Sequence, residues 1–422
     1  ERQNEQPDEH ECENHGKIQR NIQGNIQHKK RVLDLCAGSG CIGISLAVLG
    51  GFEYVAEADL SGEALKVTRK NVERLVQGAG TSVECFHGDL FSAIPDGAEP
   101  FDIATGLPLH KRTKANYTDV FATVMRKMGE RQENLVAITA AMPDGTGLKR
   151  FKNVFPERFF DVGIAEQHAV TFAAGLAAGG MIPVVAVYSS FLQRAFDQIV
   201  HDVCIQNLHV IFAVDRAGLV GSDGETHQGI FDLSYLSLIP NMCVMAPKNK
   251  WELSDMLKFA ISSDGPIALR YPRGEAYDGL SEHRAKIVYG KSELLYDEEC
   301  IALIAVGSMV KTAVEVREAL KEKGISCTVV NARFVKPIDE NMVRYLAKNH
   351  DLIVPMEENV ASGGLSEKVI TLVEQEKLPI EVLPITIPDE YVEHGNVDIL
   401  KQEIGISTSA VLEKIEKELE AK

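Results

Sequence analysis

The feature that most constrains the fold of this chain is an alternation of short apolar runs with helix-length stretches. Runs such as Leu135 to Thr139 and Pro183 to Tyr188 are apolar at nearly every position. A strand covered on both faces by helices has this composition, whereas a strand with one solvated face alternates apolar and polar residues. The alternation therefore predicts an α/β fold built on parallel sheets.

The N-terminal segment differs from the rest of the chain. Residues 1–30 are polar, and the tripeptide Asn-Ile-Gln occurs in them twice. Such a segment buries too little apolar surface to offset the entropy lost on ordering, so we predict that it is disordered. His10, Cys12 and His15 lack the spacing of a standard zinc finger, and we predict no metal site there.

Residues 31–100 are predicted to form a βαβαβ unit, which is half of a doubly wound sheet. Strands are expected at Val32–Leu35, Tyr54–Ala58 and Val83–His87, and helices at Ile42–Leu49 and Gly62–Leu75. The first strand leads into a glycine-rich turn with Gly38 and Gly40, and Asp59 follows the second strand. Such a turn lets the backbone approach an anion, and the acidic residue can bind ribose hydroxyls, although a plain tight turn is equally consistent.

The longer string from Val32 to Gly43 resembles the S-adenosylmethionine-binding half of methyltransferases, in particular the enzyme that methylates a glutamine of release factors. The resemblance implies a vestigial cofactor site at Asp34, Gly38, Gly40 and Asp59. The family's catalytic Asn-Pro-Pro-Tyr signature is missing, because the string Phe101-Asp-Ile is followed by Ala-Thr-Gly. We therefore predict a truncated Rossmann-like unit that does not transfer methyl groups.

Residues 117–277 and 299–422 are predicted to form two further α/β domains, with linkers at 101–116 and 278–298. In the first domain, strands are expected at Leu135–Thr139, Phe159–Val162, Pro183–Tyr188 and His209–Asp215, with helices starting near Thr118, Glu166 and Phe191. In the second, strands are expected near Ile301, Cys327, Asp351 and Ile380, with helices near Lys311, Asp339, Gly364 and Thr408.

A series of motifs in this part of the chain resembles 1-deoxy-D-xylulose-5-phosphate synthases, in the order in which that family has them. The motifs are Phe101-Asp-Ile-Ala-Thr-Gly106, Tyr117-Thr-Asp-Val-Phe121, Ala140-Ala-Met-Pro-Asp-Gly-Thr-Gly147, Asp161-Val-Gly-Ile-Ala-Glu-Gln-His168, Asp215-Arg-Ala-Gly-Leu-Val-Gly221, Thr226-His-Gln-Gly229 and Arg270-Tyr-Pro-Arg-Gly274. The resemblance implies a transketolase-like pyrimidine-binding domain for thiamine diphosphate, followed by a transketolase C-terminal domain. It also implies a homodimer that condenses pyruvate with glyceraldehyde 3-phosphate, releasing CO₂, for isoprenoid and thiamine synthesis.

Glu166 is the candidate with the most specific chemistry. The resemblance implies that its carboxyl group protonates the aminopyrimidine ring of thiamine diphosphate, and the largely apolar residues Val162–Ala165 before it would raise its pKa. From the residues alone, we would favour a glutamate that only complements the helix dipole.

The remaining site residues are also assigned by resemblance. Phe191 is expected to stack on the aminopyrimidine and Arg194 to lie at the cofactor, although an aromatic here could fill the core and Arg194 could pair with Asp197. Tyr188, Arg216 and Arg273 are expected at the phosphate of glyceraldehyde 3-phosphate, where two arginines at strand ends suit an anion.

Asp223 and His227 lie in a glycine-rich loop between Gly221 and Gly229. Such a loop can deliver proton transfer and close over a substrate, and the resemblance places both residues near the reacting carbons. We predict substrate binding for Asp223 and catalysis for His227. The last domain also contains Glu357, Glu358 and His394, to which no role is assigned.

The resemblance does not extend to a complete enzyme. The family binds the cofactor diphosphate through Mg²⁺ with a Gly-Asp-Gly motif in another domain, and no Gly-Asp-Gly occurs here. We therefore predict that the Mg²⁺ ligands are missing and that the chain is inactive alone. The join near Phe101 is either a gene fusion or an assembly error, and the incompleteness of both enzymes favours an error. A methyltransferase with an appended module and a non-catalytic dimer-forming fragment are the alternatives.

Composition excludes some classes of function. The net charge of −17 argues against binding nucleic acid through its phosphates, and no apolar stretch is long enough to span a membrane. Eight cysteines are scattered without a paired pattern, as expected of reduced thiols in a cytoplasmic protein.

Overall fold

The computed structural model describes residues 30–35, 52–59, 62–76, 82–87 and 114–420 of the chain. These residues belong to two compact units, residues 1–111 and residues 112–422. The predicted polar tail up to residue 29, the predicted helix at Ile42–Leu49, Gly38 and Gly40 lie outside the described residues. None of the helices in the described ranges is long and apolar enough to cross a membrane.

The first unit contains a three-stranded parallel sheet in the order β1-β2-β3, with helix α3. Its elements are β1 (Lys30–Leu35), β2 (Phe52–Asp59), α3 (Gly62–Leu75) and β3 (Ser82–His87). Val55 and Thr68 are fully buried, so α3 packs one face against the sheet. Asp34 pairs with Glu57 in the ladder, and Asp59 is the last residue of β2.

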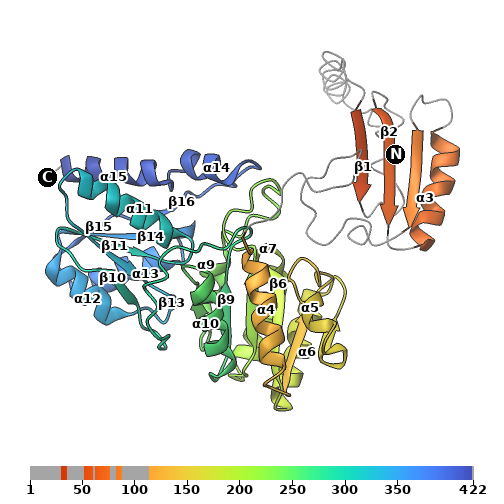
Figure 1. Ribbon diagram of the computed structural model, residues 1–422, viewed down its shortest axis with the longest axis horizontal. Helices are drawn as coiled ribbons and strands as arrows, with labels where there is room; N and C mark the ends of the chain where they lie inside the picture. The colour runs from red at the N-terminus through yellow and green to blue at the C-terminus, as the bar shows by residue number, and fades with distance from the viewer. Residues whose placement is uncertain (1–29, 36–51, 60–61, 77–81, 88–113, 421–422) are drawn as a thin grey trace, which may run out of the picture. The chain divides into compact units, whose positions relative to one another are not determined.

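The first half of the second unit is built on a seven-stranded sheet in the order β13-β8-β9-β7-β6-β4-β5 (Figure 1). Its strands are β4 (Leu135–Thr139), β5 (Phe159–Asp161), β6 (Ile182–Tyr188), β7 (Ile211–Asp215), β8 (Cys243–Met245), β9 (Ile267–Arg270) and β13 (Phe334–Lys336). All neighbours are parallel except β13, which pairs antiparallel with β8. Six strands are therefore consecutive in the chain, and the seventh comes from the following domain.

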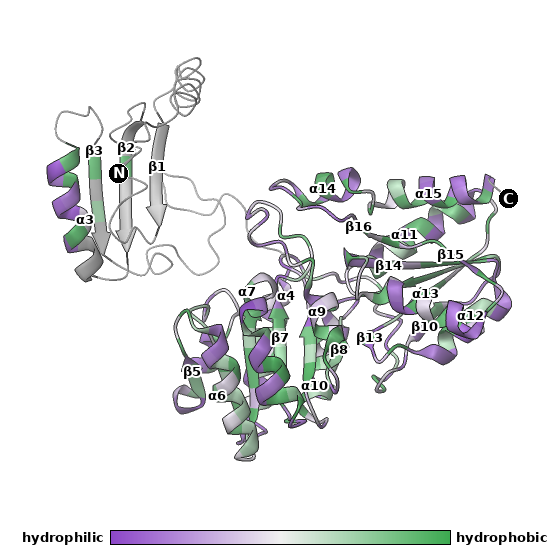
Figure 2. Ribbon diagram, turned by 180° about the vertical axis from the view of Figure 1, so that it is seen from behind, coloured by the Kyte–Doolittle hydropathy of each residue, from purple (hydrophilic) through white to green (hydrophobic). Residues whose placement is uncertain are grey.

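Helices cover both faces of this sheet, as near-continuous apolar strands require. Their bounds are α4 (Tyr117–Gly129), α5 (Lys149–Lys152), η1 (Pro156–Arg158), α6 (Glu166–Ala178), α7 (Ser189–Leu192), η2 (Gln193–Ala195), α8 (Phe196–Gln198), η3 (Ile199–Cys204), α9 (Asp232–Leu238) and α10 (Lys250–Ile261). Residues of α4 and α10 pack with Val184 on one face, and residues of α6 and α9 pack with Val185 on the other. In Figure 2 the strands are mostly hydrophobic, while hydrophilic residues gather on the outward helix faces.

The second half of this unit is a six-stranded sheet in the order β10-β12-β11-β14-β15, with β16 also pairing with β14. Its elements are β10 (Glu293–Tyr296), β11 (Ile301–Ala305), α11 (Met309–Glu322), β12 (Cys327–Asn331), α12 (Glu340–Asn349), β14 (Leu352–Val360), α13 (Leu365–Glu376), β15 (Glu381–Val382), β16 (Ile385–Ile387), α14 (Val397–Glu403) and α15 (Thr408–Glu420). The sheet is parallel except for β10, which runs antiparallel to β12. The strand β10 falls within residues 278–298, which were predicted to be a linker.

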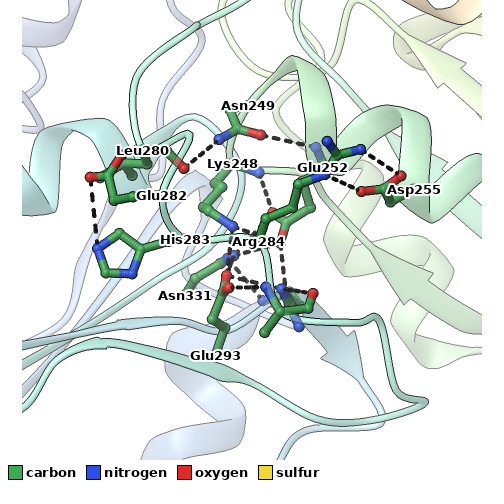
Figure 3. A network of polar contacts seen from close by, with 12 residues as sticks. Lys248, Asn249, Glu252, Asp255, Leu280, Glu282, His283, Arg284, Glu293 and Asn331 are labelled. Carbon is green, nitrogen blue, oxygen red and sulfur yellow. Dashed lines mark hydrogen bonds and ion pairs between the residues drawn. The ribbon is translucent and has the colours of Figure 1, made fainter.

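The two halves share one core. Buried residues of α9, α12 and α13, including Leu236, Leu346 and Val369, belong to a single apolar cluster that runs through both sheets. A buried polar network also joins them, and Figure 3 shows it from close by. Because β13 extends the first sheet from within the second domain, the halves are linked by backbone pairing as well.

The network consists of Lys248 before α10, Glu252 in α10, Glu293 in β10 and Arg333 after β12, all at most 6% exposed. Lys248 Nζ lies 3.1 Å from Glu252 Oε1 and 2.5 Å from Glu293 Oε2. Arg333 Nε lies 2.8 Å from the same Glu252 oxygen, and its Nη2 lies 3.0 Å from Glu293 Oε2. Burial tends to raise the pKa of Glu293, but hydrogen bonds from Lys248 and the Ala285 N–H hold that pKa below its usual value. Two cations and two carboxylates thus compensate each other.

Candidate active site

The candidate site residues gather at the carboxyl ends of neighbouring parallel strands. Glu166 follows β5, Tyr188 is the last residue of β6, Arg216 follows β7 and Arg273 follows β9. In the sheet order β9-β7-β6-β4-β5 the carboxyl ends of these parallel strands lie side by side and form one edge of the sheet, across the strand direction. Ligands of open α/β sheets bind outside this edge, so the placement suits a binding site.

Glu166 is the first residue of α6 and its side chain is only 2% exposed. Ile164, two residues before Glu166, is 81% exposed. The apolar residues that precede Glu166 in the sequence therefore do not account for its burial. Arg194 Nη1 donates a hydrogen bond to Glu166 Oε1 at 2.5 Å. The alternative partner Asp197 instead lies 2.9 Å from His201 Nδ1. Arg194 is therefore tied to the candidate catalytic carboxyl group.

Aromatic rings form the next part of the site. The ring centroids of Tyr188 and Phe191 are 5.7 Å apart, and those of Phe191 and His227 are 5.2 Å apart in an edge-on arrangement. The Arg194 guanidinium carbon lies 4.8 Å from the Phe191 ring centroid. Phe191 is therefore in contact with residues on both sides of it and is only partly buried, which leaves it able to meet a flat ligand.

Asp223 joins the two arginines assigned to a phosphate. Its Oδ2 accepts a hydrogen bond from Arg216 Nη1 at 3.0 Å and another from Arg273 Nη1 at 2.7 Å. The Arg216 guanidinium carbon lies 3.9 Å from the Tyr188 ring centroid. Burial raises the pKa of Tyr188 to about 12, so its hydroxyl stays protonated at neutral pH and can donate a hydrogen bond. These four side chains therefore form a cluster with two guanidinium groups, one phenol and one carboxylate.

His227 lies in the loop that also carries Asp223. Its Nδ1 is 2.9 Å from Thr226 Oγ1, and its ring contacts Phe191. The structure thus brings His227, Phe191 and Tyr188 together with Arg216, Asp223 and Arg273. Glu166 and Arg194 join the same group through the contact between Arg194 and Phe191.

Sequence reasoning missed a buried carboxyl group beneath this site. Asp215 ends β7, is 1% exposed, and accepts a hydrogen bond from Thr118 Oγ1 at 3.2 Å. Burial raises its pKa to about 7 against the lowering effect of Arg216. The sequence signal for this group was an acidic residue at the end of an otherwise apolar strand. A carboxyl group in that position is either exposed at the end of the strand or buried with a changed pKa.

No group of three or more His, Cys, Asp and Glu side chains is placed to hold a metal ion within the described ranges. In the methyltransferase-like unit, Asp34 and Asp59 lie on neighbouring strands β1 and β2. The turn that would complete that site lies outside the described residues.

Comparison with protein families gives three matches along the chain. Residues 113–278 match the family "Transketolase, pyrimidine binding domain", and residues 290–411 match "Transketolase, C-terminal domain". Residues 19–131 match "Methyltransferase small domain". The mixed parallel sheets agree with all three.

Two curated relatives have the same name. The chain is similar to 1-deoxy-D-xylulose-5-phosphate synthase of Lachnoclostridium phytofermentans, with 57% identity over 320 residues that cover 76% of this chain and 51% of the relative. It is similar to the synthase of Dictyoglomus thermophilum with 54% identity over 300 residues, covering 71% and 48%. The chain therefore spans about half the length of the curated relatives it matches.

Among solved structures, the chain is similar to a "Split gene transketolase, inactive beta4 tetramer", with a TM-score of 0.65 and 28% identity, covering 72% of this chain and 98% of that one. It also shares its fold with a transketolase of Campylobacter jejuni, with a TM-score of 0.60 and 19% identity, covering 84% and 52%. The matched domains, their order and the identity to the synthases agree. Residues 113–411 therefore carry transketolase-type pyrimidine-binding and C-terminal domains that are similar to those of 1-deoxy-D-xylulose-5-phosphate synthases, and a methyltransferase-like segment precedes them.

Proposed function

We propose that this chain supplies the pyrimidine half of a thiamine-diphosphate site and the acceptor-phosphate site of a 1-deoxy-D-xylulose-5-phosphate synthase. The substrates are pyruvate and glyceraldehyde 3-phosphate. One observation carries the proposal. The buried Glu166, the partly buried Phe191 and His227, and the Arg216–Asp223–Arg273 cluster all lie at the carboxyl ends of the strands of one sheet.

The residues fit the pyrimidine half of the cofactor. Thiamine diphosphate, when bound, supplies an acidic carbon whose conjugate base adds to the carbonyl group of a 2-oxo acid. Glu166 would face the aminopyrimidine nitrogen through a carboxyl group that is shielded from water and is in contact with Arg194. Phe191 would lie against the pyrimidine ring, and Arg194 would keep the carboxyl group oriented.

The Arg216–Asp223–Arg273 cluster suits a phosphorylated acceptor. Arg216 and Arg273 converge on one oxygen of Asp223, so their guanidinium groups already point to a common position. A phosphate has more acceptor oxygens than a carboxylate and a larger charge, and arginine pairs recognise it through parallel hydrogen bonds. His227, next to Phe191, is the group from which a proton could reach the acceptor carbonyl.

The cofactor diphosphate and its Mg²⁺ would be bound by a separate diphosphate-binding chain. No described cluster of side chains in this chain suits the metal. A solved protein of nearly the same two-domain extent is named as the inactive tetramer of a split transketolase. We therefore propose that this chain is inactive alone and active in trans, as a homodimer bound to such a partner.

The test is CO₂ release from pyruvate with thiamine diphosphate and Mg²⁺, with and without glyceraldehyde 3-phosphate. We expect no turnover by the chain alone and acceptor-dependent turnover after addition of the diphosphate-binding domain of a synthase relative. Glu166→Ala in the same mixture is the control. No turnover in the mixture, together with an unchanged melting temperature in every ligand, would favour a non-catalytic dimer-forming fragment instead.

The match of residues 19–131 to a methyltransferase domain supports a second activity for the first unit, namely S-adenosylmethionine binding. Asp59 at the end of β2 is placed where a ribose-binding acid is expected. A calorimetric titration with S-adenosylmethionine tests this: binding lost in Asp59→Ala would support it, and no heat in the wild type would exclude it.

A further inference from the structure

The loop that carries Asp223 and His227 is closed at its base by Gly218 and Gly229, and we call this pair of residues the neck of the loop. Gly218 and Gly229 exchange both backbone hydrogen bonds, at 2.7 and 2.8 Å, so residues 219–228 form a closed loop. Inside it, the side-chain oxygen of Gln228 accepts a hydrogen bond from the Val220 N–H at 2.7 Å. The positions of Asp223 and His227 therefore depend on what holds this neck.

The C-terminal domain holds the loop at three places. Glu358 Oε1 accepts a hydrogen bond from the Leu219 N–H at 2.8 Å. Gln228 Nε2 donates to the carbonyl oxygen of Glu393 at 3.0 Å, and the Gly395 N–H donates to the carbonyl oxygen of Gly221 at 3.2 Å. A surface depression of about 430 Å³ beside Asp223 is lined by the loop together with Glu393 and His394.

Glu358 is itself fixed on all sides. It lies in β14, is 2% exposed, and its Oε2 accepts a hydrogen bond from Ser308 Oγ and lies 3.3 Å from Lys401 Nζ. Its carbonyl oxygen accepts a hydrogen bond at 3.2 Å from Arg270 Nη2, which also donates to Gly229 at 3.3 Å. The carboxyl group thus has a single orientation, directed at the neck of the loop.

The neck is shaped to accept this carboxyl group. Gly218 has a φ of +78°, and a Cβ atom on it would lie 2.7 Å from the Glu358 carboxyl carbon. Only glycine combines this backbone conformation with so close an approach. The neighbouring Glu357 is bonded elsewhere, because its carboxyl group accepts hydrogen bonds from the Leu365 and Ser366 N–H groups at the start of α13.

We propose that Glu358 of the C-terminal domain is a positioning residue for the acceptor-phosphate site, acting through Leu219 and the loop to keep Asp223 between Arg216 and Arg273. This inference rests on the proposed function, which places the phosphate at the two arginines. The C-terminal domain would then take part in acceptor binding and would not only support the assembly. Without Glu358, the neck loosens, Asp223 no longer aligns the guanidinium groups, and a phosphate meets them one at a time.

The experiment is a ³¹P NMR titration of the full chain with inorganic phosphate, together with hydrogen exchange of the loop amides. We expect Glu358→Ala to weaken phosphate binding about tenfold or more and to speed exchange of the Leu219 amide. Glu358→Gln keeps an acceptor for Leu219 and should stay within about threefold of the wild type. Glu357→Gln, equally buried on the adjacent position, should change neither measurement.

Gly218→Ala is a second variant that disturbs the neck from the loop side and leaves Glu358 intact. We expect it to weaken phosphate binding as Glu358→Ala does, and melting curves identify any variant that is unfolded. Phosphate binding that both variants leave unchanged would overturn the positioning role. If the wild type binds no phosphate, or binds it equally after Arg216→Ala and Arg273→Ala, the acceptor site of the proposed function fails, whatever Leu219 shows.

Discussion

Glu166 and Arg194 differ sharply in their surroundings, although they share a hydrogen bond. The carboxyl group is almost completely shielded from water, whereas 49% of the Arg194 side chain is exposed. Loss of the Glu166 carboxylate leaves a guanidinium group that water can solvate, so substitution of Glu166 should have little effect on stability. We propose that the hydrogen bond from Arg194 instead orients the Glu166 carboxyl group for proton transfer.

We therefore expect Glu166→Gln to lower turnover in the mixture with a diphosphate-binding domain by roughly 10²- to 10⁴-fold, the usual range for loss of a general acid or base. The melting temperature should remain close to that of the wild type. Steady-state CO₂ release and differential scanning calorimetry measure the two effects. Turnover that survives the substitution would remove Glu166 from the catalytic residues.

The buried carboxyl group of Glu357 should make the stability of the protein depend on pH. Burial raises its pKa to about 7, although the N–H groups of Ser366 and Leu365 act in the opposite direction. A carboxyl group whose pKa is higher in the folded state than in the unfolded state binds its proton more tightly in the folded state. The contribution of Glu357 to the free energy of unfolding therefore falls as the pH rises from the unfolded pKa to about 7. Glutamine is neutral throughout and lacks this dependence.

The stability of Glu357→Gln relative to the wild type should therefore increase between pH 5 and pH 8, by up to about 3 kcal/mol if the full shift is realised. Melting temperatures of both proteins across this range are the measurement. A difference between the two proteins that is constant with pH would mean that Glu357 ionises normally in the folded protein.

At the scale of elements, the junction between the two sheets combines an apolar core with paired charges. The segment before helix α10, the helix itself, strand β10 and the segment after β12 meet at Lys248, Glu252, Glu293 and Arg333. Figure 3 labels the first three of these residues. Asn331 Nδ2 donates to both oxygens of Glu252 at 2.9 and 3.0 Å, which completes their hydrogen bonding. Removal of one cation leaves two buried carboxylates with a single arginine.

Lys248→Met should accordingly destabilise the second unit by about 3–5 kcal/mol, because an uncompensated charge would remain in the interior. Lys258→Met in helix α10, which follows Lys248, is the matched control. Lys258 is 46% exposed and pairs with Asp255 at 3.1 Å, so we expect a change of at most about 1 kcal/mol. Denaturant titration compares them, and equal effects of the two substitutions would show that the buried network is not a source of stability.

At the scale of the whole molecule, the chain consists of two compact units, residues 1–111 and residues 112–422. The apolar clusters of the second unit contain residues from Tyr117 onward only. In the first unit, β1 and β3 have no second neighbour among the described strands. Sheet edges of this kind are sites of association between chains.

We predict that residues 112–422 expressed alone fold and melt at the same temperature as the corresponding transition of the full chain. They should also remain soluble at higher concentration, because the open edges of the first unit have been removed. Calorimetry and light scattering of the two proteins test this. A lower melting temperature of the shorter protein would show that the first unit stabilises the second.

The sequence predicted most of the long elements of the second unit. The strand at Leu135–Thr139 has the predicted bounds, and α6 begins at Glu166 as predicted. Three-residue strands such as Cys243–Met245 and Phe334–Lys336 were missed, because a run of that length has no periodicity to distinguish it from a loop. The strand β10 was missed for a related reason, since it is short and lies between loops.

What the sequence determined by itself was the α/β class, the order of the domains and the residue types at the carboxyl ends of the strands. These follow from local patterns of apolar residues and from motifs a few residues long. Only the tertiary structure decided the partners: Arg194 on Glu166, Asp223 between two arginines, and Glu358 on Leu219, 139 positions away in the chain. Such contacts arise because packing two sheets around one core brings distant segments together, and no local pattern encodes which polar groups then meet.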